Sequence, residues 1–291
     1  MKFSFLAIML SGAIVCGHTQ AQETLKVVPE VPATAKAWEP YSLPEPPAPV
    51  SVVPALTVVG GVQTNHEIWP STVPINESCT ATIVGERTVF SAAHCMPNDA
   101  TINVRLPLHG NRTVKATCQW HPNYVDNNIE YSRFMFDYAL CKFDSVSFEP
   151  EGHFETISTI HTDGNKGNNV TLLGFGCTST GGIDYGTLFM GGTKIVKEAV
   201  LPGDVYIGIS GKAALCPGDS GGSAYKNDDI TDVRSSRKII AVNSRSDAMP
   251  YGQGLISATS SESFIRWAKN WASTNSAPIC GITSGARGCR L

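Results

Sequence analysis

The sequence has little charge. Asp, Glu, Lys and Arg make up 16% of its 291 residues, and the formal net charge is −3. It has no run of like charges, so the clustered basic surface that nucleic-acid binding requires is not expected. Beyond the N-terminus it also lacks an apolar run long enough to cross a bilayer. Long helical patterns are scarce, whereas glycine is frequent, at 27 residues. A globular, β-rich chain is therefore favoured.

Residues 1–21 predict a secretory signal peptide. Lys2 precedes an apolar run from Phe3 to Val15 that is too short for a membrane span, and Ala21 ends a suitable cleavage site. An N-terminal membrane anchor is one alternative. A lipid-modified Cys16 is another, which the bulky Val15 before it disfavours. We expect a secreted protein, extracellular or periplasmic, with no membrane contact once the signal is removed.

Residues 22–57 differ in composition from the rest of the chain. They hold eight prolines, no glycine and no cysteine. Such a segment favours extended polyproline conformations and forms no core of its own. It is either a propeptide or a permanent spacer.

From Val58 onward, short apolar runs are separated by Gly, Asn, Asp and Pro. This pattern predicts short strands of a sandwich or barrel fold. One helix is predicted near the C-terminus, where Ser260 and Ser261 offer a cap before Glu262.

The nine cysteines leave one thiol without a partner. Removal of residues 1–21 removes Cys16, and the remaining eight in an exported chain indicate disulfide bonds. Eight cysteines allow 105 pairings, so counting alone does not decide among them. No pair of Cys or His residues has zinc-site spacing, so we expect no metal and no cofactor.

Three short segments hold the residue types of a catalytic centre: Ser-Ala-Ala-His-Cys at 91–95, Asp-Tyr-Ala-Leu at 137–140 and Gly-Asp-Ser-Gly-Gly at 218–222. A serine hydroxyl becomes a good nucleophile when a histidine removes its proton, and a buried carboxylate fixes the tautomer of that histidine. The glycines let the backbone turn sharply and direct N–H groups towards an oxyanion.

In this order, His then Asp then Ser, the segments resemble the trypsin/chymotrypsin family of serine proteases. The resemblance covers about residues 58 to 271. It includes the Cys79 and Cys95 pair around the histidine, Gly-Phe-Gly at 174–176 and Val-Val-Gly-Gly at 58–61.

The resemblance implies an all-β fold of two antiparallel six-stranded, chymotrypsin-like β-barrels, with the active site between them and a C-terminal helix. The protease domain would span residues 58–273, and a disulfide-closed tail would span 274–291. We expect the aromatic residues of the helix, Phe264, Trp267 and Trp271, to pack against the second barrel.

The resemblance also implies the catalytic roles. His94 would act as general base and then general acid, Asp137 would orient it, and Ser220 would be the nucleophile. The N–H groups of Gly218 and Ser220 would form the oxyanion hole.

Activation is expected to depend on Val58. By the same resemblance, cleavage between Thr57 and Val58 would free an ammonium group that folds inward and pairs with Asp219, and so orders the oxyanion loop. Because Thr57 is neither Lys nor Arg, an activating enzyme of trypsin-like preference is not expected; another protease or self-processing is required.

Substrate preference follows from the expected pocket. Its floor is Ala214 where trypsins carry aspartate, so cleavage after Lys or Arg is disfavoured. The apolar floor favours uncharged side chains. Arg245 would instead attract an acidic one, and Asp247 would neutralise Arg245 or restore a basic preference. The residues expected to bind substrate are Ala214, Leu215, Ser244, Arg245, Ser246 and Gly254.

The resemblance supports one disulfide bond, Cys79–Cys95, and proximity in the sequence suggests a second, Cys280–Cys289. A third pair, Cys177–Cys216, would tether the loop before Ser220. The pair that remains is Cys118–Cys141.

The sequence thus predicts a secreted serine endopeptidase, monomeric, that hydrolyses peptide bonds in proteins or peptides. An activating protease and protein inhibitors are its expected partners. A non-catalytic binding module with the same fold and an esterase with the same triad are the alternatives.

Overall fold

The computed structural model describes residues 58, 61–125, 136–144, 154–177, 185–198, 206–210, 213–226, 236–246 and 253–290. All of them belong to one compact unit, Val52–Leu291. The predicted signal peptide and proline-rich segment lie outside the described residues. Among the helices within these ranges, none is both long and apolar enough to cross a membrane.

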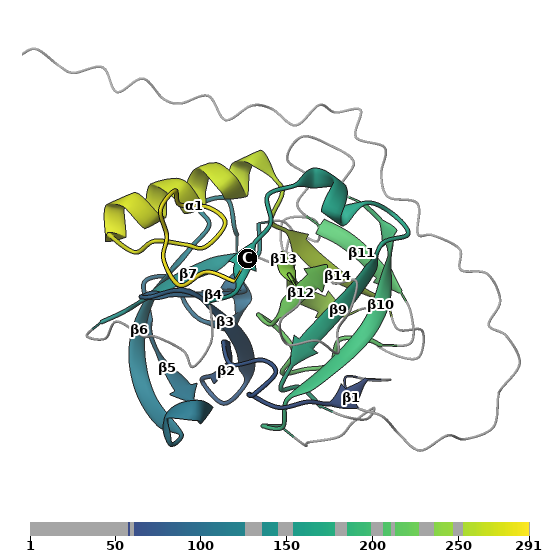
Figure 1. Ribbon diagram of the computed structural model, residues 1–291, viewed down its shortest axis with the longest axis horizontal. Coiled ribbons are helices and arrows are strands. Elements are labelled where there is room, and N and C mark those ends of the chain that lie inside the picture. The colour runs from purple at the N-terminus through teal and green to yellow at the C-terminus, as the bar shows by residue number, and fades with distance from the viewer. Residues whose placement is uncertain are drawn as a thin grey trace, which may run out of the picture. The chain divides into compact units, whose positions relative to one another are not determined.

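Six antiparallel strands close into a first barrel, in the order β2-β3-β4-β7-β6-β5 (Figure 1). Its strands are β2 (Thr72–Ile75), β3 (Cys79–Gly85), β4 (Thr88–Ser91), β5 (Thr101–Leu106), β6 (Arg112–Trp120) and β7 (Ala139–Phe143). In β5, exposed and buried residues alternate, as expected for a strand with one face on a core. Every residue of β3 and β4 is buried instead. Both strands are covered from outside the barrel: the Thr82 hydroxyl bonds the Ser223 hydroxyl at 2.8 Å, and the Thr88 hydroxyl bonds the Ala277 carbonyl at 3.3 Å.

The second barrel closes because β9 pairs with both β10 and β12. Its ring is β9 (Asn169–Gly174), β10 (Phe189–Lys197), β11 (Tyr206–Ser210), β14 (Gln253–Ala258), β13 (Lys238–Ser246) and β12 (Ser223–Lys226). All pairs in this ring are antiparallel. Two short strands join it from outside: β1 (Val62–Gln63) pairs with β10, and β8 (Thr156–Ile157) pairs with β13 in parallel. The predicted fold of two six-stranded barrels is confirmed.

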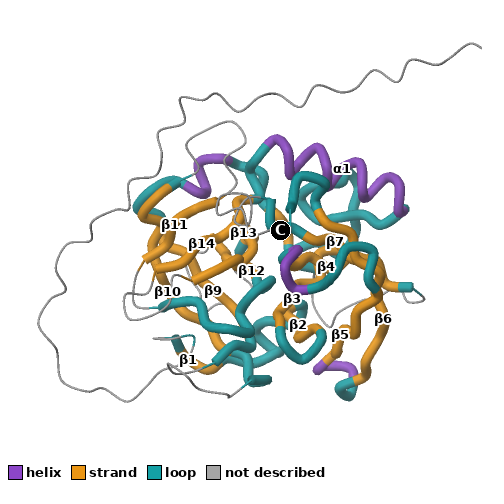
Figure 2. The backbone as a smooth tube through the Cα atoms, turned by 180° about the vertical axis from the view of Figure 1, so that it is seen from behind, coloured by secondary structure: helices purple, strands orange, loops and turns teal. Residues whose placement is uncertain are grey.

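The C-terminal helix α1 spans Glu262–Asn275, two residues past the predicted end of the domain at 273. Ser261 caps it, because its hydroxyl accepts a hydrogen bond from the Phe264 N–H at 3.2 Å. The expected packing against the second barrel is wrong. The Phe264 ring lies against Phe90 of β4 and Tyr138 beside β7, and Figures 1 and 2 both place α1 along the first barrel.

The tail after α1 returns between the barrels. Cys280 donates its N–H to Val84 of β3 and accepts one from Ile157 of β8, at 2.8 and 3.0 Å. Beneath the tail, Glu155 is wholly buried between two cations, with Arg237 at 2.6 Å and Arg290 at 3.5 Å. Four disulfide bonds are present, in the same pairs that the sequence suggests: Cys79–Cys95, Cys118–Cys141, Cys177–Cys216 and Cys280–Cys289.

Candidate active site

His94 and Asp137 form a close pair. His94 lies in a 3₁₀ turn (Ala93–Cys95) directly after β4, and Asp137 lies just before β7, the neighbour of β4 in the barrel. The His94 Nδ1 is 2.7 Å from Asp137 Oδ2, and the His94 backbone N–H donates to Oδ1 at 3.0 Å. Asp137 is completely buried, whereas the His94 side chain is 20% exposed. A carboxylate in this position fixes which imidazole nitrogen carries the proton.

Asp137 has a second side-chain partner. The Ser244 hydroxyl donates to Asp137 Oδ2 at 2.5 Å. Burial raises the pKa of Asp137, but the charge of His94 and the hydrogen bonds from His94 and Ser244 outweigh it and hold the pKa below its ordinary value. Asp137 is therefore ionised near neutral pH. Ser244, predicted only as a substrate-binding residue, also orients this carboxylate.

Ser220 and His94 line the same cavity, of about 270 Å³. Four of the six predicted substrate-binding residues line it too: Leu215, Ser244, Arg245 and Ser246. Ala214 and Gly254 are buried and do not line it. At Gly254, a Cβ would lie 3.3 Å from the side chain of Ile209, so the space there is already filled.

The loop before Ser220 is held by its carbonyl groups. The Pro217 carbonyl accepts the Cys177 N–H at 3.1 Å, and the Asp219 carbonyl accepts the Gly222 N–H at 3.0 Å and the Asn243 amide at 3.2 Å. In a trans peptide the N–H points away from the C=O, so these bonds also fix the N–H directions of Gly218 and Ser220. Neither N–H donates a hydrogen bond to any residue that the structure describes.

Asp219 is buried beneath this loop. Its carboxylate accepts the N–H groups of Gly176 and Cys216 at 2.9 and 2.8 Å. Burial raises its pKa to about 7, although these two hydrogen bonds act in the opposite direction. A Cβ on Gly174 or Gly176 would lie 2.1 or 2.6 Å from Asp219 Oδ1, which explains why both positions are glycine.

Val58 is also buried, and it packs on the inside of the second barrel rather than in the cavity. A Cβ on Gly191 of β10 would lie 3.3 Å from its side chain. In the uncut chain its nitrogen is part of a peptide bond and carries no charge. Among the described residues, no polar contact joins Val58 to Asp219.

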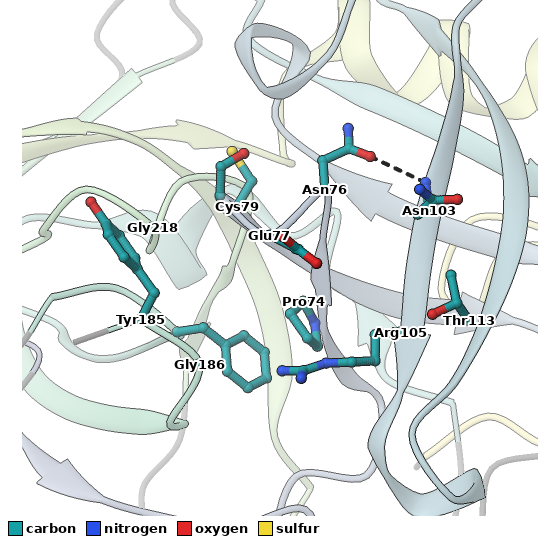
Figure 3. Close-up of a pocket in the computed structure, with 12 residues that line it drawn as sticks. Pro74, Asn76, Glu77, Cys79, Asn103, Arg105, Thr113, Tyr185, Gly186 and Gly218 are labelled. Carbon is teal, nitrogen blue, oxygen red and sulfur yellow. Dashed lines mark hydrogen bonds between the residues drawn. The ribbon is translucent and has the colours of Figure 1, made fainter. Parts of the chain in front are cut away.

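A larger cavity, of about 570 Å³, has Gly218 in its lining (Figure 3). Its lining contains a basic side chain, Arg105 of β5, and an acidic one, Glu77 in the turn between β2 and β3. Phe175 and Tyr185 provide aromatic surface. The sequence analysis did not identify this cavity, because its residues come from six separate stretches of the chain without a shared motif.

One further residue at the site escaped the sequence analysis. Thr80 of β3 is buried and bonds to the loop at 218–220. It lies in no recognisable catalytic motif, and only its position next to Cys79 pointed to it. Asn243 of β13, which the sequence places in the wall of the substrate pocket, does not line the cavity of Ser220 and bonds to the Asp219 carbonyl instead.

His94 and two neighbouring cysteines do not form a metal site. Among the described residues, Cys79, Cys95 and His94 make up the one group whose ligand atoms lie close enough together to hold an ion. The two sulfur atoms, however, are joined in a disulfide bond and offer no thiolate.

The two barrels, with His94 and Asp137 on one and Ser220 on a loop of the other, define a protein of the chymotrypsin-like serine protease class. A model of the Trypsin family matches residues 58–268, and the chain belongs to that family. Among similar proteins are chymotrypsin-like elastase family member 1 of Rattus norvegicus, 24% identical, and of Bos taurus, 25% identical; each match covers 58% of this chain and 73% of the relative. Brachyurin of Leptuca pugilator is 25% identical over 58% of this chain and 82% of its own length.

Proposed function

We propose that this chain is a secreted serine endopeptidase that hydrolyses peptide bonds through an acyl-enzyme on Ser220. One observation carries the proposal: a buried, ionised Asp137 is bonded to His94, which lines the same cavity as Ser220, and on the loop that carries Ser220 the N–H groups of Gly218 and Ser220 have no hydrogen-bond acceptor among the described residues. Acyl transfer requires this combination of base, nucleophile and oxyanion donors.

The groups of the site act in turn during the reaction. His94 takes the proton of the Ser220 hydroxyl as that oxygen attacks the substrate carbonyl, and Asp137 stabilises the resulting imidazolium. The N–H groups of Gly218 and Ser220 bind the negative oxygen that forms. His94 then gives its proton to the leaving amine. A water molecule, activated by His94 in the same way, attacks the acyl-enzyme and releases the acid and free Ser220.

The experiment is labelling with a fluorophosphonate probe, combined with turnover of peptide and ester substrates. The processed wild-type protein should label and cleave peptides, and Ser220→Ala should do neither while keeping its unfolding midpoint. Absence of labelling would favour the binding module, and ester turnover without peptide turnover would favour an esterase.

For the residue before the cut bond, we propose a preference for uncharged side chains. No acidic residue among the described ones lines the cavity that holds Ser220, so none of them would compensate a buried Lys or Arg side chain; Asp247 lies outside the described residues. Arg245 adds a positive charge to the lining. A library of peptides varied only at that residue tests this. Preference for arginine would refute the proposal, and preference for glutamate or aspartate would assign the selection to Arg245.

We also propose export followed by cleavage between Thr57 and Val58. Support comes from the buried position of Val58 and from its backbone, which has a φ of 40°. A positive φ strains a β-branched residue, and cutting the preceding bond releases that dihedral. Sequencing of the active species should read Val-Val-Gly-Gly. An active species that starts near Gln22 would refute the activation step.

A further inference from the structure

Thr80 is completely buried where the first barrel meets the loop that carries Ser220. Its hydroxyl accepts the Phe175 N–H at 3.0 Å and donates to the Gly218 carbonyl at 2.8 Å. Its backbone N–H donates to the Ser220 carbonyl, also at 2.8 Å. A strand residue of the first barrel is therefore bonded to both Gly218 and Ser220 of the second.

The hydroxyl of Thr80 acts on the peptide unit between the two proposed oxyanion donors. Hydrogen bonds to the carbonyls of Pro217 and Asp219 fix the peptide units on either side. The Gly218–Asp219 peptide lies between these two units. Its N–H donates to the Cys216 carbonyl at 2.9 Å, and its C=O accepts only the Thr80 hydroxyl among the described residues. The orientation of the Gly218–Asp219 peptide therefore sets the angle between the Gly218 N–H before it and the Ser220 N–H after it.

Gly218 makes that bond necessary. Its φ is 102°, and a Cβ there would lie 2.7 Å from Gly176, so glycine is required. Glycine also permits many backbone conformations, so rotation of the Gly218–Asp219 peptide is opposed by two bonds, from its N–H to the Cys216 carbonyl and from Thr80 to its own carbonyl. A buried carbonyl without a partner would favour such a rotation.

We propose that Thr80 is a positioning residue of the catalytic centre: its hydroxyl holds the Gly218 carbonyl and so keeps the Gly218 and Ser220 N–H groups directed at one point. This role rests on the proposed endopeptidase function, because only a developing oxyanion requires both donors together. The hydroxyl contacts no reacting atom and acts through the loop.

The test compares Thr80→Val, which keeps the side-chain shape without the hydroxyl, with Thr80→Ser, which keeps the hydroxyl. Removal of one oxyanion donor costs about 10²–10³ in kcat, so misdirection should cost about tenfold to a hundredfold. KM should change by less than about twofold, because the donors act mainly on the transition state. Thr80→Ser should keep kcat within about threefold of wild type.

A peptide aldehyde separates positioning from a general loss of structure, because its hemiacetal oxygen occupies the oxyanion position. In Thr80→Val its inhibition constant should rise by the same factor as kcat falls. The matched control is Thr82→Val on the same strand, which removes the bond to Ser223 and leaves the loop at 218–220 untouched. It should keep the wild-type kcat and aldehyde affinity.

Wild-type kcat in Thr80→Val would overturn the role of Thr80, and so would an equal loss in Thr80→Ser or in Thr82→Val. Thr80→Ala, which removes the hydroxyl without adding bulk, gives the same comparison if the valine variant does not fold. Processed wild-type protein that neither labels with fluorophosphonate nor cleaves peptides would instead refute the proposed function itself.

Discussion

The buried carboxyl of Asp219 should make the uncut chain less stable as pH rises. The perturbation is Asp219→Asn, in a full-length Ser220→Ala background that cannot process itself. In the folded chain burial raises the pKa of Asp219 from 3.8 to about 7. Between these values the folded chain keeps a proton that the unfolded chain has lost, so the folded state binds more protons and raising the pH favours unfolding.

The size of the effect follows from the shift. Each unit of pKa corresponds to about 1.4 kcal/mol, so the ionisation of Asp219 should cost about 4 kcal/mol of unfolding free energy at pH 7.5 and less than about 1 kcal/mol near pH 4. Asp219→Asn removes this pH-dependent part. It also adds a constant penalty, because one amide N–H₂ must face the N–H of Gly176 or Cys216 where the carboxylate accepted a bond.

The assay is urea unfolding of both proteins between pH 4 and pH 8. The unfolding free energy of the Asp219-containing chain minus that of Asp219→Asn should fall by about 4 kcal/mol across this range. A difference that stays constant within about 1 kcal/mol would refute the reasoning. The proposed cleavage after Thr57 would supply a cation for Asp219, so the same comparison on processed protein should lose this downward trend.

Three more outcomes are expected. Arg237→Met should lower the unfolding free energy by about 3–5 kcal/mol in urea titrations, because it removes a cation bonded to the buried Glu155. Burial lowers the pKa of His121 to about 4, so the folded chain excludes a proton that the unfolded chain binds below about pH 6.5. Thermal melts should therefore show that, as the pH is lowered from 7 to 4, the melting temperature of His121→Phe falls less than that of the wild type. Asp137→Asn should keep the fold by circular dichroism but reduce kcat about 10⁴-fold in peptide assays, because His94 then takes the wrong tautomer.

The sequence predicted the barrels well because the signals it contains are local. Short apolar runs with turn residues between them predicted a sandwich or a barrel, and the resemblance carried by the catalytic segments reduced this to two barrels and identified the loop that holds Ser220. The packing of α1 was predicted wrongly, because a one-sided row of aromatic residues shows that a helix is amphipathic but not which barrel covers it. That choice depends on where Phe90 and Tyr138 lie in three dimensions.

The glycines of the catalytic loop illustrate the same limit. The sequence attributed them to sharp turning of the backbone. In the structure Gly221 has a φ of 80°, and a Cβ on it would lie 2.1 Å from the Ser91 hydroxyl; a Cβ on Gly222 would lie 2.2 Å from the Leu173 carbonyl. Close approach of neighbouring strands is thus a second requirement, and it comes from contacts that no local pattern contains.

These contacts bear on what the two barrels contribute to the site. The Ser91 hydroxyl, three residues before His94, donates to the Thr80 carbonyl at 2.9 Å, while the Thr80 N–H and hydroxyl bond to Ser220 and Gly218. The strand that leads to the proposed base is therefore linked through one residue to the loop that carries the proposed nucleophile. Because the bonds that orient that loop come partly from the first barrel, the second barrel alone lacks part of what holds the two proposed oxyanion donors in place. The site belongs to the interface, and a substitution that removes the bonds of Thr80 to the loop should change kcat before it changes the fold of either barrel.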